Sequence, residues 1–423
     1  MAGRRTWTYT QSTENALFKV AYGKHNAMAF NQRSVLYGRI KKKTNFKGKQ
    51  MESSIRLSYG GGRGSGRLPR ASRALYKTIT LTTKKLYHRL SIDNETFEAS
   101  KSSVGAFVNM SKEPMEVARI AFSNLLERQI VLGDLTGTGK LFVTATDATH
   151  DAVSASSEET ADASAATVTL VLTSATIDAV VEEGDVLDLY SQGTNTRLGT
   201  GEVRSYDEDT RALVLRALTD VAAVTAGVDF YLQNSKDAEL SGLQGVLTAT
   251  TGTYKGIAIG RRWEAYQQAA DGTSAVADRI KKQLNKAILQ IIKRCGEAPT
   301  LLMCDHEVYT QILDEFEGIK RVQIPARGKG LKGQVGYAAL EYVSPQGTIP
   351  VVFNRYVPAG QLYLLNENKI ELCMRAAPQW LDRDGTVFLR EQDLDSYEAR
   401  YGLYTDLFIQ PFYQGIITGL NLA

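Results

Sequence analysis

Cysteine and histidine are scarce in this sequence, and their scarcity excludes several classes of protein. The three cysteines, at positions 295, 304 and 373, are too few and too irregularly spaced for a disulfide framework. The four histidines, at positions 25, 88, 150 and 306, are far apart, and none makes a zinc-ligand spacing with a cysteine pair. We therefore expect no metal and no cofactor, in a protein made in a reducing compartment.

Long apolar runs are missing as well. No run approaches the roughly 20 residues that a membrane-spanning helix needs, and residues 1–18 lack the apolar core of a secretory signal. The hydrophobic and charged fractions, 43% and 23%, are those of a folded soluble protein. A chain of 423 residues is too long for one core. We therefore expect about three domains and no membrane partner.

Acidic residues are nearly absent between positions 39 and 89. This stretch contains 15 basic residues and a single acidic one, Glu52. Residues 54–59 and 75–86 alternate apolar and polar side chains, which predicts two strands. The glycine-rich segment between them cannot hold a regular element. We interpret the stretch as a two-stranded flap. Because an isolated two-stranded ribbon is marginal in water, we expect the flap to lie on an external surface.

Residues 111–133 predict one long helix. Ser111 is a suitable cap, Pro114 fits the first turn, and Gly133 closes the far end. Its apolar stripe consists of Met115, Ala118, Phe122 and Leu125. From position 114 to 132 such a helix is roughly 28 Å long, enough to cross a domain. Residues 12–23 predict a shorter helix, which is marginal alone and needs a surface to pack on.

Beyond the long helix the chain has the pattern of an ordinary globular protein. Residues 147–167 have the composition of a solvated linker, and residues 167–233 predict short strands of a small barrel or sandwich inserted into the main fold. Residues 273–296 predict a second long helix, followed by a buried strand at 299–304 and a helix capped by Asp305, which together indicate an α/β layer. From position 347 the pattern returns to strands.

Two motifs resemble catalytic or phosphate-binding sites. Residues 133–141, GDLTGTGKL, imitate a phosphate-binding loop, but Asp134 replaces its first glycine and Leu141 replaces the Ser or Thr after the lysine. The segment also follows a helix rather than a strand, so we reject this interpretation. Residues 304–307, CDHE, are interpreted as a strand end and a helix cap. Since no catalytic signature stands out, we expect no enzymatic activity.

This order of elements resembles the major capsid protein of tailed double-stranded DNA bacteriophages, which has the Hong Kong 97-like fold. The most similar text is GTIPVVFNRYVPAGQLYLLNENKIEL at 347–372 and WLDRDGTVFLREQDLDSYEARYGLYTDLFIQPFYQGIITGL at 380–420. The resemblance covers nearly the whole chain and implies an α+β fold. Its parts would be an N-terminal arm (1–35), an extended β-hairpin loop (36–100), a peripheral domain with the spine helix (101–150), an inserted small all-β domain (151–237), an axial α/β domain (238–350) and return strands of the peripheral and axial domains (351–423).

The resemblance implies a structural protein that self-assembles, as hexameric and pentameric capsomers, into the icosahedral head shell around the viral DNA. It would be located in the virion, and in the host cytoplasm during assembly. Implied partners are a separate scaffolding protein, the portal, a decoration protein and the packaged DNA, bound non-specifically. The alternative is a nucleic-acid-binding DNA-packaging protein whose basic arm follows phosphates. A solvated surface loop is the third interpretation of the flap.

In a shell, the flap is expected to lie on a neighbouring subunit. Its candidate contact residues are Arg63, Arg67, Arg70, Arg73, Lys84 and Lys85. The candidate carboxylates near the C-terminal strands are Asp382, Asp384, Glu391, Asp393 and Asp395. The candidate hinge consists of Gly61, Gly62 and Gly64, and their replacement by alanine is expected to impair assembly or shell expansion. Some relatives join subunits by lysine–asparagine bonds, for which the flap offers lysines but no identifiable partner asparagine.

Overall fold

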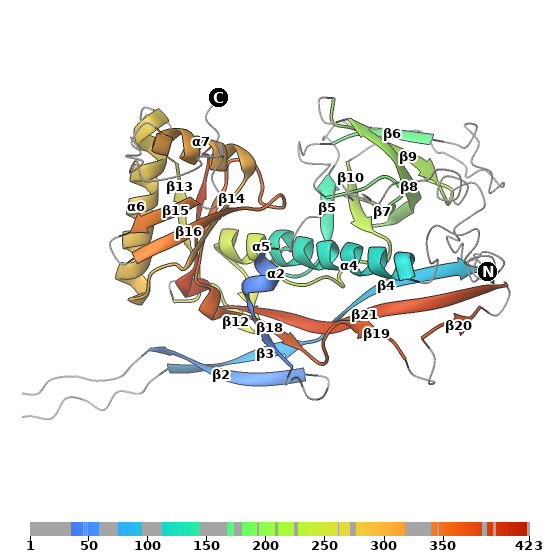
Figure 1. Cartoon of the computed structure of the whole chain (residues 1–423), viewed down its shortest axis with the longest axis horizontal. Coiled ribbons are helices and arrows are strands. Elements are labelled where there is room, and N and C mark those ends of the chain that lie inside the picture. Colours follow the sequence, from blue (N-terminus) through green and yellow to red (C-terminus); the bar gives the residue numbers. More distant parts are fainter. Residues whose placement is uncertain are drawn as a thin grey trace, which may run out of the picture. The chain divides into compact units, whose positions relative to one another are not determined.

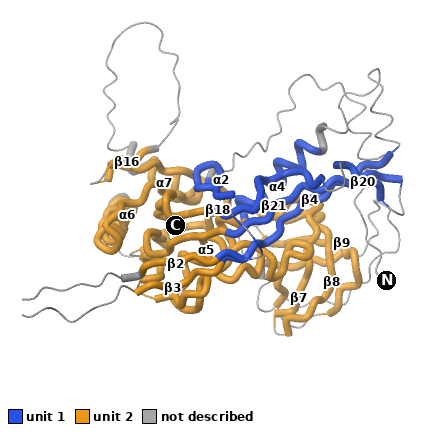
Figure 2. The backbone as a smooth tube through the Cα atoms, turned by 90° about the horizontal axis from the view of Figure 1, so that it is seen from below, with its two compact units in different colours: residues 1–51, 81–128, 372–406 blue, residues 52–80, 129–371, 407–423 orange. Residues whose placement is uncertain are grey.

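The computed structural model describes residues 35–44, 46, 48, 50–58, 75–94, 112–143, 167–172, 180–192, 194–207, 210–223, 227–260, 262–270, 276–317, 340–344, 347–382, 387–391 and 395–420 (Figure 1). The chain forms two compact units, which Figure 2 distinguishes by colour. Unit 1 consists of residues 1–51, 81–128 and 372–406, and unit 2 of residues 52–80, 129–371 and 407–423. The helix predicted at 12–23 lies outside the described residues.

A sheet and a long helix make up unit 1. The helix is α4 (Lys112–Leu132), whose residues up to 128 belong to this unit. The strands of the sheet are β1 (Lys41–Lys43), β4 (Lys84–Asp93), β18 (Ile370–Met374), β19 (Gln379–Trp380), β20 (Leu389–Arg390) and β21 (Ser396–Ile409). β21 pairs with β4 in antiparallel register, from Ser396 opposite Asp93 to Thr405 opposite Lys84. The short helix α2 (Val35–Arg39) precedes β1.

The predicted long helix is confirmed, and its predicted apolar stripe is confirmed in part, because Met115 and Leu125 are only half-buried. Ala118, Phe122 and Leu126 of α4 are buried, and the ring of Phe122 meets that of Tyr401 on β21 edge to face, with centroids 4.9 Å apart. Gly133 does end the helix, although not in the left-handed conformation that commonly follows a C-terminus. A Cβ there would lie 2.6 Å from the backbone nitrogen of Gly242, so close packing requires glycine.

β2 (Gln50–Ser58) and β3 (Leu75–Thr82) pair as a two-stranded sheet of their own. We name this pair the ribbon. It confirms the predicted hairpin, but the prediction of one strand through 75–86 was wrong. β3 ends at Thr82, and β4 begins at Lys84 in a different sheet. The alternation continues through the break. At the break, the N–H of Thr82 donates to the carboxylate of Asp406 at 3.0 Å.

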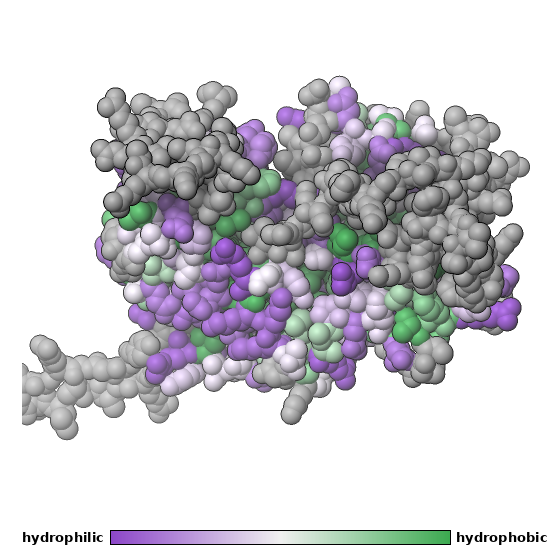
Figure 3. All heavy atoms as spheres, in the orientation of Figure 1, coloured by the Kyte–Doolittle hydropathy of each residue, from purple (hydrophilic) through white to green (hydrophobic). Residues whose placement is uncertain are grey.

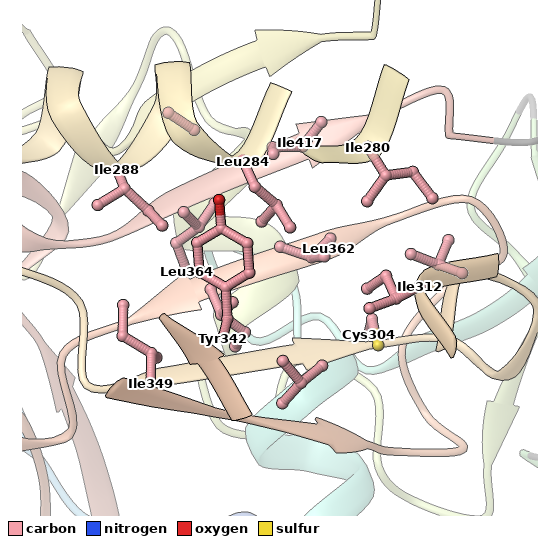
Figure 4. Close-up of a cluster of buried hydrophobic side chains, with 14 of the residues drawn as sticks. Ile280, Leu284, Ile288, Cys304, Ile312, Tyr342, Ile349, Leu362, Leu364 and Ile417 are labelled. Atoms are coloured by element: carbon pink, nitrogen blue, oxygen red, sulfur yellow. The ribbon is translucent and has the colours of Figure 1, made fainter. Parts of the chain in front are cut away.

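Unit 2 contains a mixed six-stranded sheet in the order β13-β22-β17-β14-β16-β15. The strands are β13 (Tyr266–Ala269), β14 (Leu301–Cys304), β15 (Leu340–Ser344), β16 (Gly347–Phe353), β17 (Leu362–Leu365) and β22 (Gly415–Thr418). β13 with β22 and β14 with β16 are parallel pairs, and the others are antiparallel. Helices α6 (Val276–Cys295) and α7 (His306–Glu317) pack on this sheet through one buried cluster (Figure 4).

The predicted second helix, buried strand and α/β layer are therefore confirmed. Ile280, Leu284 and Ile288 of α6 lie on one side of the helix, point toward the sheet in Figure 4 and are buried. Every residue of β14 is buried, as its continuous apolar run predicted. Shorter elements of unit 2 are α5 (Leu243–Thr248), β11 (Thr253–Tyr254), β12 (Ile257–Ala258) and two 3-10 turns, η1 (Glu367–Lys369) and η2 (Pro411–Tyr413).

The all-β insertion is a second sheet of unit 2, with six antiparallel strands in the order β5-β10-β7-β8-β9-β6. They are β5 (Lys140–Val143), β6 (Thr167–Val171), β7 (Val186–Ser191), β8 (Arg197–Asp207), β9 (Ala212–Ala217) and β10 (Val228–Leu232). One cluster of buried residues, including Leu187, Leu213 and Phe230, forms its core. The strands predicted between 167 and 233 are thus confirmed, and β5 joins them from an earlier point in the chain.

Candidate functional site: surfaces for subunit contact

Most of the ribbon is exposed on both faces. Residues 75–78 are all exposed, and successive residues of a strand point to opposite faces. Leu75 and Tyr76, which are 48% and 58% exposed, therefore present apolar surface on both sides. Only near the end of β3 are side chains buried, at Ile79 and Leu81. The described contacts leave this part of the ribbon without a core of its own.

The end of the ribbon is anchored firmly within unit 2. The N–H of Thr80 donates to the carbonyl oxygen of Lys255 at 3.2 Å. Lys255 and Gly256 form the turn between β11 and β12, with φ of 50° and 85°, the left-handed values of a tight hairpin turn. Behind this turn the indole of Trp263 stacks on Tyr254 and on Phe408, with ring centroids 6.3 and 6.5 Å apart. The ribbon thus starts from a fixed base.

One face of the molecule can be compared with the ribbon in Figure 3. On the face drawn in Figure 3, hydrophobic residues form separate spots among hydrophilic ones. A broad apolar patch, which commonly marks a compact protein interface, is not seen among the coloured residues of this face. The exposed apolar residues of the ribbon suit contact along an extended segment rather than across a flat interface.

Two of the predicted contact residues, Glu391 and Asp395, already have partners within unit 1. Arg89 on β4 forms ion pairs with Glu391 and, at 2.8 Å, with Glu398 on β21. The hydroxyls of Ser91 and Ser396 also donate to Glu391. Asp395 lies 3.9 Å from Arg390 and accepts a hydrogen bond from the side chain of Asn94.

The remaining predicted residues fall into two groups. Lys85 and Asp382 are exposed, and Lys84 is half-buried. Positions outside the described residues are Arg63, Arg67, Arg70, Arg73, Asp384, Asp393, Gly61, Gly62 and Gly64. The structure therefore does not test the predicted pairs between flap and carboxylates, and it does not test the predicted glycine hinge.

A structural residue that the sequence did not reveal is Glu127. Its two carboxylate oxygens accept hydrogen bonds from the backbone N–H groups of Leu36 and Tyr37, at 2.7 and 2.8 Å. These are early N–H groups of α2, which have no partner inside that helix. Glu127 is 2% exposed. An acid inside an apolar stretch of a long helix was the only available signal, and it does not identify the partner.

Comparisons with known proteins bear on both units. The family model described as SU10 major capsid protein matches residues 206–384. A solved structure, the cyanophage A-1(L) capsid asymmetric unit, is similar with a TM-score of 0.56 and 13% identity, covering 97% of this chain and 99% of that one. The chain has the fold of a tailed-phage major capsid protein. The predicted family resemblance and the predicted Hong Kong 97-like fold are thereby confirmed.

Other solved structures are also similar, at lower scores. A chain of Mycobacterium phage Bobi gives a TM-score of 0.47 at 10% identity, covering 97% of this chain and 98% of that one. A chain from the capsid of a native GTA particle gives 0.47 at 8% identity and 96% coverage of both. No curated protein matches. The family model and the capsid fold support a structural, shell-forming role, and neither supports the alternative of a DNA-packaging protein that binds through a basic arm.

The motifs that resembled reactive sites have structural explanations in this capsid fold. Burial, followed by the charge of Asp305, raises the pKa of the Cys304 thiol, which disfavours a reactive thiolate. In the false phosphate loop, Asp134 accepts hydrogen bonds from the N–H and hydroxyl of Thr138 at 2.7 and 2.6 Å. Lys140 there pairs with Asp229 at 2.7 Å. Among the described residues, no three acidic, histidine or cysteine side chains gather as a metal site would need.

Arg89, Glu391, Glu398 and Arg400 form a group of ion pairs, here called the Arg89 cluster. We expect this cluster to make the stability of the fold depend on pH in the acid range. Although burial opposes ionisation, hydrogen bonds from Arg400 and Arg89 and their charges lower the pKa of Glu398 from its ordinary 4.5. Its carboxylate therefore stabilises the fold above that value, and the contribution is lost as the pH falls through the lower folded-state pKa. We expect acidification from pH 7 to about 3 to remove roughly 1 kcal/mol through this group. Glu398→Gln should lack this part of the loss.

Urea unfolding at the two pH values measures this loss of unfolding free energy. Glu116→Gln is the matched control, because Glu116 is exposed on α4 and its variant should follow the wild type. Equal pH dependence of the wild type and Glu398→Gln would show that the cluster does not act in this way.

Among the described helices, none combines the length and the apolar character needed to cross a bilayer.

Proposed function

We propose that this chain assembles with copies of itself into the icosahedral head shell of a virion that encloses double-stranded DNA. The observation that carries the proposal is the ribbon, which exposes both faces at residues 75–78 while its base is anchored. A two-stranded ribbon is marginal in water. Lying across another copy would cover the side chains that are exposed at residues 75–78.

Self-association into hexameric and pentameric capsomers follows from this proposal, since closed shells repeat the same interfaces around symmetry axes. A separate scaffolding protein, a portal and a decoration protein are proposed as further partners, and the host cytoplasm as the place of assembly. We infer no catalytic role, because the matched family is one of structural proteins.

Among the proposed contact residues, Lys85 and Asp382 are the best placed, because both are exposed. Glu391 would have to leave Arg89 to reach a neighbour. Exposed ion pairs contribute about 0–1 kcal/mol each, so several must act together. The glycine hinge at Gly61, Gly62 and Gly64 remains part of the proposal, as the bend that lets the ribbon follow its neighbour.

Electron microscopy of the purified full-length protein tests the proposal. Closed, regular particles are the expected result, formed by the wild type and lost or malformed when the three hinge glycines are replaced by alanine. A protein that stays a monomer at high concentration, with and without added scaffold from its source, would overturn the shell assignment.

A further inference from the structure

Helix α6 has two chemically distinct sides. One side carries Ile280, Leu284, Ala287, Ile288 and Ile291, all buried against the sheet. The helical repeat places Lys282, Lys286, Leu289 and Lys293 together on the opposite side. All four are exposed, Leu289 at 51%. We call these four residues the α6 stripe, which is about 16 Å long at 1.5 Å per residue.

The lysines of the α6 stripe are not accounted for by the fold. Ion pairs within the described part of the chain involve none of Lys282, Lys286 and Lys293. The helix dipole favours a cation in the last turn, which explains Lys293. It does not explain Lys282 and Lys286, which lie more than two turns before the end of α6. Within the described part of the chain, the stripe therefore collects positive charge that no ion pair neutralises.

We propose that the α6 stripe binds the phosphate backbone of the double-stranded DNA inside the shell, a role that rests on the proposed function. DNA carries one negative charge per about 3.4 Å of each strand. A row of lysines on long flexible side chains can follow such charges without reading sequence. The stripe is separate from the basic ribbon and uses a rigid helix rather than a flap.

Phosphate fits this surface better than a protein partner does. Protein interfaces gain most of their binding energy from clustered aromatic or arginine side chains in a desolvated centre, and lysine is depleted there. The stripe has three lysines and the single apolar Leu289. Contact with phosphates requires the lysine charges and not the leucine. Contact with a protein would depend on Leu289 as its only apolar centre.

Salt-dependent DNA binding by the full-length chain tests the inference. The probe is a 30-base-pair duplex of random sequence, titrated by fluorescence anisotropy between 50 and 200 mM salt. Each phosphate contact contributes about 0.9 to the slope of log K against log salt. Replacing Lys282, Lys286 and Lys293 by glutamine should therefore reduce the slope by about 2.7, which is about a 40-fold smaller loss of affinity over this range.

Two matched variants complete the design. Replacement of the same lysines by arginine should keep the wild-type slope, because the charges remain, and Leu289→Ala should keep it too. All these positions are exposed, so particle formation should be unchanged in every variant, and thermal stability should fall only by the small contribution of Lys293 to the helix dipole. An unchanged slope in the glutamine variant would overturn the inference. So would an equal loss of DNA affinity in Leu289→Ala, which would show that binding does not depend on the lysine charges.

The two proposals can fail separately. A wild type that binds DNA through the stripe and forms no particles would contradict the shell and leave the stripe as a DNA-binding surface. A glutamine variant that loses particle formation while its slope stays at the wild-type value would make the stripe a subunit contact and overturn the DNA assignment.

Discussion

Subunits that carry Leu75→Ser and Tyr76→Ser together will stay folded and will fail to form particles at concentrations where the wild type assembles. Both side chains are about half exposed in the single subunit, so their loss removes little from its own stability. Covering the remaining apolar surface on a neighbour is worth about 2–3 kcal/mol for the pair. At 1.4 kcal/mol per factor of ten, the association constant should fall about 30- to 140-fold.

Light scattering against protein concentration, with electron microscopy of the products, measures this effect. The matched control is Val171→Ser on β6, which removes an apolar side chain of similar exposure, 47%, from the inserted sheet. That variant should assemble like the wild type. If the ribbon variant assembles at the wild-type concentration, the exposed part of the ribbon does not hold subunits together.

Phe122→Ala is expected to have the largest effect on folding. Phe122 is 2% exposed and packs its ring edge to face on Tyr401, in the contact between α4 and the sheet of unit 1. Truncating a buried phenylalanine costs about 3–5 kcal/mol, through lost burial and the cavity that remains. Because whole domains are stable by about 5–15 kcal/mol, this loss threatens the fold of unit 1.

The measurement is the urea midpoint of the purified subunit, followed by circular dichroism. Glu116→Ala serves as the control, because it removes an exposed side chain from the same helix and should shift stability by no more than about 0.5 kcal/mol. Similar midpoints for the two variants would show that α4 is not held to its sheet by this contact.

Local periodicity predicted the elements that carry these effects. The stripes of α4 and α6 were visible because one buried face of a helix repeats every 3.6 residues. The buried strand β14 was visible as a short continuous apolar run. For these elements the local sequence pattern predicts which side of the helix or strand is buried, and the structure places that side in the core.

Pairing between distant segments was not predictable in the same way. Alternation runs unbroken from β3 into β4, although the two strands lie in different sheets and Thr82 at the break bonds to Asp406, 324 residues away. Arg89 and Glu391 are 302 residues apart, so no local sequence pattern could predict their ion pair. Charge alone nominated Glu391 as a contact for another subunit, whereas the fold supplies a partner within the chain.

Hydrogen–deuterium exchange of the ribbon, in free subunits and in assembled particles, tests most directly whether other copies complete this chain. Amides of residues 79–82 should be protected in both states, because Ile79 and Leu81 are buried and the N–H of Thr80 bonds to Lys255. Amides of residues 75–78 should exchange quickly in free subunits and at least about 30-fold more slowly in particles, matching the 2–3 kcal/mol expected for the contact. Equal protection of residues 75–78 in the two states would contradict the account.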